Sequence, residues 1–121
     1  MRQLPKETIP GGAKFNATSD VYLESGHVCI RKNIVEKIFG TETVVLSVFY
    51  ENDHSYLVSP ASEEPFRKLH KSNQQLLKTK NAEGDKSISI QELLLDYDID
   101  EQDKDLAFQV EERVHLLKIM L

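Results

Sequence analysis

The chain has 121 residues, of which 40% are hydrophobic and 29% are charged, and it carries a formal net charge of −5. This length gives one domain, or two very small halves that share a core, and the ordinary composition excludes a disordered or fibrous protein. No apolar run reaches the roughly 20 residues of a membrane span, and the polar N-terminus lacks the apolar stretch of a secretion signal, so we expect a cytoplasmic protein without a membrane contact.

The first 30 residues predict an arm followed by two strands. In residues 1–14, prolines and glycines interrupt any hydrophobic period, which predicts a flexible N-terminal arm. Residues 15–23 and 28–30 then predict two strands. The turn between these strands contains Gly26, which can adopt the positive φ that a tight turn needs.

The next 30 residues predict a short helix and a second pair of strands. In residues 33–39 the apolar side chains recur with helical spacing, and Gly40 stands where a glycine often ends a helix. Residues 44–50 form the strongest strand pattern in the chain. After a polar turn, residues 54–58 return as the partner of that strand.

A helix at 61–80 is predicted to connect the two halves of the chain. Ser62 is suited to cap this helix, and acidic residues and Pro65 follow in its first turn. Beyond the helix, the hydropathy pattern predicts, in order, a strand at 87–90, a short helix at 92–97, an acidic loop at 98–105, and strands at 106–110 and 114–120.

The two halves share one order of elements, and they align without gaps at an offset of 60 residues. The apolar pairs at this offset include Val28 with Ile88, Ile34 with Leu94, Leu46 with Leu106, Val48 with Phe108, Tyr50 with Val110 and Leu57 with Leu117. A repeat of this kind decides the fold. We therefore expect a tandem duplication, with a first unit at 15–60, the connecting helix at 61–80 and a second unit at 81–121.

The repeated unit resembles the AbrB-type swapped hairpin. In the first unit it stands as Leu23-Glu-Ser-Gly-His-Val-Cys-Ile-Arg-Lys-Asn-Ile-Val-Glu-Lys-Ile-Phe-Gly40, followed by residues 44–58. Two such units in one chain, with a helix after a strand that ends in Ser-Pro, look like the MraZ family over residues 15–119. The resemblance implies a mainly β fold with short helices (α+β), in which two pseudo-symmetric swapped-hairpin units form one intertwined, barrel-like core.

The MraZ resemblance also implies a function, but the motif that carries this function is altered. MraZ-like proteins are DNA-binding transcriptional regulators of bacterial division and cell-wall gene clusters, and they assemble into rings. Their signature is Asp-x-x-x-Arg in each unit. In the first unit Leu23 and His27 stand at the Asp and Arg positions. In the second unit Glu83 and Ser87 stand there at the offset of 60, or Asn81 and Asp85 if the turn is shifted to superpose its glycine. The arginine is therefore missing from both units.

Four residues near the first turn form the candidate nucleic-acid-binding surface: His27, Arg31, Lys32 and Lys37. Basic side chains bind phosphates with little regard to sequence, through charge and counterion release. Residues 1–80 carry 11 Lys and Arg against 9 Asp and Glu, a balance of +2, whereas residues 81–121 carry 4 against 11, a balance of −7. Any nucleic-acid contact should therefore lie in the first half. The alternative is a solvated surface with scattered basic residues.

A second basic group lies in the predicted connecting helix. Its members are Arg67, Lys68, Lys71, Lys78 and Lys80. A charged run on a helix is usually a solvated face. We favour its pairing with the acidic residues 96–105, within the chain or across a subunit interface, over a contact with nucleic acid.

The sequence carries no motif for catalysis, a metal or a cofactor. From Asp96 to Asp100 carboxylates alternate as in a calcium loop, but Glu101 stands where that loop needs glycine. His27 and Cys29 alternate on one strand, and two ligands leave a zinc site incomplete. We therefore expect no enzyme, no cofactor, no metal and no small-molecule substrate.

Two apolar segments indicate an assembly. Residues 44–49 and 114–121 are nearly continuous in apolar side chains, which is typical of strands buried on both faces. We expect intertwined halves and a homo-oligomer, either a dimer or a ring. Two functions follow from the sequence: a MraZ-like regulator that binds double-stranded DNA through diverged contacts, or a non-enzymatic assembly or protein-interaction protein that keeps the fold and has lost DNA binding.

Overall fold

The computed structural model describes residues 15–121, so the arm predicted at 1–14 lies outside the described residues. The described chain is mainly β with short helices. Its elements in order are β1 (Val21–Glu24), β2 (His27–Ile30), α1 (Lys32–Ile38), β3 (Val44–Tyr50), β4 (Ser55–Pro60), α2 (Glu64–Leu69), β5 (Asn73–Leu76), β6 (Lys78–Thr79), β7 (Lys86–Ser89), α3 (Gln91–Asp96), β8 (Lys104–Asp105), β9 (Ala107–Glu111), the 3₁₀ turn η1 (Glu112–Val114) and β10 (Leu116–Met120).

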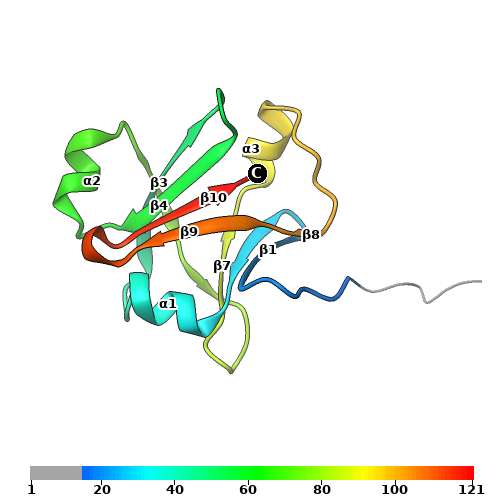
Figure 1. The fold of residues 1–121 in the computed structure, drawn as a ribbon, viewed down its shortest axis with the longest axis horizontal. Helices are drawn as coiled ribbons and strands as arrows, with labels where there is room; N and C mark the ends of the chain where they lie inside the picture. The colour runs from blue at the N-terminus through cyan, green and yellow to red at the C-terminus, as the bar shows by residue number, and fades with distance from the viewer. Residues whose placement is uncertain (1–14) are drawn as a thin grey trace, which may run out of the picture.

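The strands form two antiparallel sheets that face each other across the core (Figure 1). Sheet A has the order β6-β7-β2-β1-β8, and sheet B has the order β5-β3-β4-β10-β9. Each sheet takes strands from both halves of the chain. The expected barrel does not close within the described residues, because the strands hydrogen-bond as two sheets.

Each sheet has a central pair of strands with one flanking strand on either side, and a fifth strand, β8 in sheet A and β5 in sheet B, lies at one edge. In sheet A, β2 pairs with β7, and β1 and β6 flank them. In sheet B, β4 pairs with β10, and β3 and β9 flank them. At the centre of sheet A, Val28 lies directly opposite Ile88, the residue 60 positions later. Equivalent residues meet in this way when a two-fold axis relates the halves, so the strand order supports the duplication.

The offset of 60 is wrong for the hairpins of sheet B. The turn between β3 and β4 is closed by Tyr50 opposite Ser55, and the turn between β9 and β10 by Glu111 opposite Leu116, which is 61 positions later. A shift of one residue in the alignment matters because it moves every side chain of a strand to the opposite face of the sheet. Thus Leu46, predicted to match Leu106, lies in the outer cluster, whereas Leu106 lies in the core between the sheets.

Helices α1 and α3 lie at opposite ends of the molecule (Figure 1). Helix α1 buries Ile34, Val35 and Ile38, as its spacing predicted. The helix ends at Phe39, and Gly40 follows with a φ of +58°, the left-handed conformation that glycine adopts at little cost. Together, the three buried side chains of α1 close one end of the space between the two sheets.

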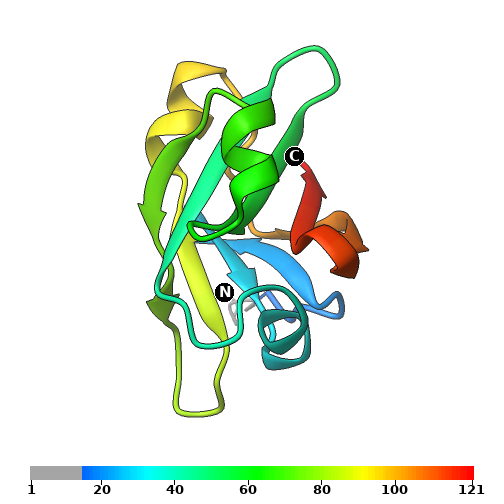
Figure 2. The same ribbon diagram turned by 90° about the vertical axis from the view of Figure 1, so that its left-hand side faces the viewer.

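The helix predicted at 61–80 is much shorter in the structure. Helix α2 covers only Glu64–Leu69, and β5 and β6 follow it. Phe66 is buried in the outer cluster of sheet B, and α2 lies across that face (Figure 2). Beyond Leu69 the chain is more stable as a strand, because β5 pairs with β3 and Leu77 becomes buried in the core. Leu69 ends α2, Leu76 ends β5, and Leu77 lies between β5 and β6.

Each hairpin of sheet A contacts the helix start of the other half. The carbonyl of Gly26, in the β1–β2 turn, accepts a hydrogen bond of 3.0 Å from the Ile90 N–H at the start of α3. Reciprocally, the Asp85 carboxylate, in the β6–β7 loop, accepts one of 2.8 Å from the Lys32 N–H at the start of α1. These contacts tie the two units together at both helix starts.

Candidate functional site

The predicted nucleic-acid-binding residues lie at the two ends of β2 and on α1. His27 begins β2, beside the turn, and its Nδ1 lies 2.9 Å from the Ser25 carbonyl oxygen. Arg31 immediately follows β2 and precedes α1. Lys32 and Lys37 lie on α1. The structure therefore spreads the four residues along one strand and one helix instead of gathering them around the turn.

Arg31 is held by the chain that precedes β1. Its guanidinium donates hydrogen bonds to the carbonyl oxygens of Ser19, at 3.4 Å, and Ala17, at 3.2 Å. The guanidinium carbon also lies 5.3 Å from the centre of the Tyr22 ring, a cation–π distance. Arg31 thus fastens residues 17–19 to sheet A, and this structural task competes with a phosphate contact.

The segment that Arg31 holds is also fixed by Asp105 on β8. The Asp105 carboxylate accepts hydrogen bonds from the N–H groups of Thr18, at 3.0 Å, and Ser19, at 3.1 Å. The Thr18 hydroxyl also donates to it, and this bond is the largest cause of the lowered pKa of Asp105. The surface beside Arg31 therefore carries a fixed negative charge, which opposes the approach of a nucleic acid.

Lys32 and Lys37 each have an acidic neighbour. Lys32 lies 3.9 Å from Glu36, one helical turn away, and Lys37 lies 3.9 Å from Glu112 in η1. The side chains of both lysines are more than half exposed, so these ion pairs contribute little to stability. Their main effect is to neutralise the local field that would attract phosphates.

Lys80 is a second basic side chain on the outer face of sheet A, and it also has an acidic partner. The Lys80 ammonium donates a hydrogen bond of 2.7 Å to the Glu24 carboxylate. At the β1–β2 turn the Ser25 N–H donates to the carboxylate of Asp103, at 2.9 Å. The β1–β2 turn is therefore flanked by two carboxylates.

Cys29 has the environment of a core residue. It is 2% exposed, and burial raises the pKa of its thiol, which keeps the thiol protonated and poorly nucleophilic. Its sulfur contacts the carbonyl oxygen of His27 at 3.8 Å. Within residues 15–121, no group of three or more His, Cys, Asp and Glu side chains is placed to hold a metal ion.

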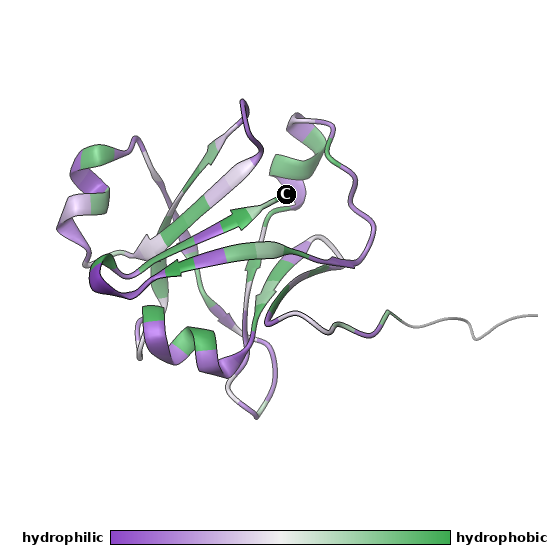
Figure 3. Ribbon diagram, in the orientation of Figure 1, coloured by the Kyte–Doolittle hydropathy of each residue, from purple (hydrophilic) through white to green (hydrophobic). Residues whose placement is uncertain are grey.

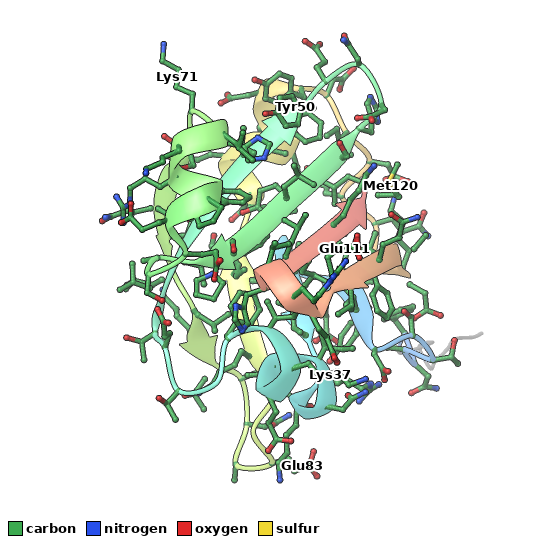
Figure 4. All side chains as sticks on the ribbon, turned by 60° about the vertical axis from the view of Figure 1, so that its left-hand side comes forward. Lys37, Tyr50, Lys71, Glu83, Glu111 and Met120 are labelled. Atoms are coloured by element: carbon green, nitrogen blue, oxygen red, sulfur yellow. The ribbon has the colours of Figure 1, made fainter. Side chains whose placement is uncertain are left out.

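The predicted pairing of the basic connecting segment with the acidic residues 96–105 is not formed inside the chain. No ion pair between these two groups occurs in the part of the chain that the structure describes; Lys80 pairs instead with Glu24, and Arg67 donates a hydrogen bond of 2.7 Å to the Ala61 carbonyl. Lys71 extends away from the body of the molecule (Figure 4). The basic side of α2 faces solvent.

An exposed apolar face lies beside α2. Leu69 is 76% exposed at the end of this helix, and Val114 is 43% exposed in η1. Together with Pro65, Phe66 and Leu116 they line a shallow groove of about 90 Å³ between α2 and β10. Figure 3 shows hydrophobic and hydrophilic segments alternating along α2. We call Leu69, Val114 and the groove between them the α2 face.

Comparisons with protein-family models, with curated proteins and with solved structures gave no match. Nor does the described part of the chain contain a helix with the length and apolar character needed to cross a membrane. The assignment of a function therefore rests on the residues and their geometry.

Sequence reasoning missed one feature, a cavity beside α3 that is lined by Ser47 and Tyr56. Both residues stand in strongly apolar strands, where a single serine or tyrosine is easily taken as part of a packed core. A signal existed in the comparison of the halves, because both positions are apolar in the second unit once the offset of 61 is applied.

Proposed function

We propose that this chain is a non-catalytic assembly protein, built on a MraZ-like pair of swapped hairpins, that has lost DNA binding. The interlocked strand order and the reciprocal hairpin–helix contacts support the swapped-hairpin fold. The observation that carries the function is the α2 face, where Leu69 and Val114 are exposed side by side on one groove. Soluble proteins expose apolar grooves mainly where another molecule covers them.

The partner that best fits the α2 face is a second copy of this chain. Arg67 and Lys68 lie on α2, and Glu111 and Glu112 lie in and before η1, on the other side of the groove. A two-fold contact brings the basic side of one groove against the acidic side of the other. The same arrangement pairs the basic residues of α2 with Glu111 and Glu112, and not with the acidic residues 96–105.

The oligomeric state tests this proposal. We expect the purified protein to be a dimer or larger in analytical ultracentrifugation, and Leu69→Glu to be a monomer, because it places a charge in the apolar contact. The matched control is Leu95→Glu, at a leucine that is 65% exposed on α3 and does not line the groove of the α2 face. A monomeric wild type, or an oligomer unchanged by Leu69→Glu, would contradict the proposal.

DNA binding is the second candidate, and the exposure of Lys32 and Lys37 favours it. Their ion pairs are long, at 3.9 Å, and a phosphate can displace the carboxylates. If the assembly proposal is right, we expect no DNA binding, or weak binding that is equal for all sequences, since the neighbouring carboxylates repel phosphates. Fluorescence anisotropy at rising salt, with DNA from upstream of the gene and a scrambled duplex, measures this binding.

A pair of double variants separates the two candidates. Lys32→Glu with Lys37→Glu changes the charge of α1, and Lys71→Glu with Lys78→Glu changes the charge by the same amount at exposed positions that do not line the α2 face. Equal, weak binding to both duplexes supports the assembly proposal. Tight binding to the upstream duplex that only the first double variant abolishes makes the chain a DNA-binding regulator, and the salt dependence then counts its phosphate contacts.

A further inference from the structure

The outer edge of β9 is open in the described chain. This strand lies at the end of sheet B, and among residues 15–121 it pairs only with β10 (Figure 1). None of its five residues is buried, whereas all six residues of β4, inside the same sheet, are buried. The edge strands of sheet A, β6 and β8, have only two residues each. An open edge of this length presents backbone N–H and C=O groups that can pair with another chain.

Two residues of β9 direct their backbone groups to this edge. The Leu106 N–H, just before β9, donates to the Val21 carbonyl oxygen at 3.0 Å, so it points away from β10. Along a strand, the backbone groups of successive residues point to alternate sides. The N–H and C=O groups of Phe108 and Val110 therefore lie on the open edge. No backbone group among residues 15–121 pairs with them there.

The other half of the chain fills the equivalent place with a strand. At the offset of 61, Phe108 corresponds to Ser47 on β3, and Ser47 pairs with Asn73 of β5. In the second half, continuing the register of β1 with β8 would place Ser19 opposite Phe108. The Ser19 N–H is bound instead by the Asp105 carboxylate, at 3.1 Å, and β1 begins only at residue 21. The place beside β9 is thus left without the strand that the duplication provides beside β3.

A second copy of β9 matches the backbone of this edge. Antiparallel pairing about a two-fold axis at Gln109 places Phe108 of one copy opposite Val110 of the other. Residues that face each other in this way exchange two hydrogen bonds, one in each direction. Every N–H and C=O group that the two edges present then has a partner. The contact is self-complementary, as a two-fold interface requires.

The side chains of β9 also fit this register. Phe108 and Val110 pack against the core on the inner side of the strand, and across the axis they form an aromatic–β-branched pair, which is a favourable cross-strand contact. On the outer side Glu111 lies opposite Ala107, and Gln109 lies opposite its own copy, so no like charges meet. The strand has neither lysine nor proline, the residues that many edge strands use to prevent pairing.

We propose that β9 pairs with β9 of a second copy of this chain and thereby joins two dimers into a tetramer or larger assembly. The contact is separate from the α2 face, whose groove is lined by residues of α2, η1 and β10 and by His70. It rests on the proposed function. A contact between two five-residue strands is smaller than a stable interface, in which each partner buries about 800 Å². It therefore needs dimers, built on the α2 face, that each present two edges.

Analytical ultracentrifugation of Gln109→Lys tests the contact. We expect the wild type to be a tetramer or larger and Gln109→Lys to be a dimer, because two lysines then face each other across the axis, each beside Lys118 of its own β10. The matched control is Gln74→Lys, at an exposed glutamine of β5, the opposite edge strand of sheet B, and it should keep the wild-type assembly. Both variants should keep the wild-type melting temperature, because both positions are exposed.

Hydrogen exchange followed by NMR locates the contact on the strand. The N–H groups of Phe108 and Val110 should exchange slowly in the wild-type assembly. They should lose this protection in Gln109→Lys and in the monomeric Leu69→Glu, where no second strand covers the edge. The Lys118 N–H is the internal reference, because β10 is paired on both sides and should stay protected in all three proteins.

The outcomes separate the β9 edge from the α2 face. The edge contact is overturned if Gln109→Lys leaves the assembly size unchanged, or if Phe108 and Val110 exchange equally fast in the wild type and in Leu69→Glu. Neither result affects the α2 face, provided that Leu69→Glu still dissociates the dimer. An assembly that survives Leu69→Glu and is dissociated by Gln109→Lys contradicts the α2 face and supports the edge contact. A monomeric wild type contradicts both.

Discussion

Replacing Leu117 by alanine is expected to lower the free energy of unfolding by about 2–5 kcal/mol. Leu117 is the second residue of β10, opposite Val58 on one side and Val110 on the other, and it is fully buried. Leu117 links the two halves of the structure, because its strand β10, in the second half, pairs with β4 of the first half. The lower stability should therefore have two causes. The favourable free energy of transferring the leucine side chain from water into the core is lost, and a cavity remains that the paired strands cannot close.

Urea denaturation followed by circular dichroism measures this loss, and two further leucines calibrate it. Leu57→Ala, in the smaller outer cluster with Phe66, should cost less than Leu117→Ala. Leu95→Ala, at an exposed position, should stay within about 0.5 kcal/mol of the wild type. If Leu57→Ala proves more harmful than Leu117→Ala, the outer cluster and not the space between the sheets is the main core.

The local elements were predictable because their signals lie within a few residues. Gly26 and Gly40 both adopt the positive φ that their positions suggested, and the strand pattern at residues 44–50 coincides with β3. The helix spacing at 33–39 also predicted which side chains α1 buries. In each case the side chain or backbone preference acts over one turn or one strand, so no distant contact is needed to read it.

The errors came from contacts between distant parts of the chain. Residues 73–79 carry two leucines and one lysine, which favour a helix, but pairing with β3 and β7 makes the strands β5 and β6 of residues 73–76 and 78–79. The offset of 60 failed in sheet B because an alignment without gaps cannot register one inserted residue. Strand pairing decides both points, and the sequence contains no local signal for it.

The candidate site shows the same limit. A list of basic residues correctly named side chains at or near the surface, but it could not reveal that Arg31 is bound to the Ser19 carbonyl or that Lys37 faces Glu112. Ser19 lies 12 residues before Arg31, and Glu112 lies 75 residues after Lys37, so each becomes a neighbour only through the fold. For this reason the sequence overstated the basic character of the surface around β2.

Replacing Asp85 by alanine is expected to cost about 2–3 kcal/mol, because it leaves two donors without their acceptor. Asp85 is 6% exposed, although it lies in a hairpin loop. One carboxylate oxygen accepts from the Lys32 N–H at 2.8 Å, and the other accepts from the Asn81 side chain at 3.0 Å. Since the first N–H groups of a helix have no partner within it, Asp85 supplies α1 with a cap from the opposite half of the chain.

The variants of this loop distinguish a cap from a merely buried charge. Asp85→Asn keeps one carbonyl acceptor and should lose about half as much stability as Asp85→Ala. Glu83→Ala is the control, since Glu83 lies exposed at the tip of the same hairpin (Figure 4) and should stay within about 0.5 kcal/mol of the wild type. Hydrogen exchange adds a readout: Asp85→Ala should speed exchange at Ile34 and Val35, on α1, more than in β4. An equal increase in both elements would mean that Asp85 supports the whole fold and does not specifically cap α1.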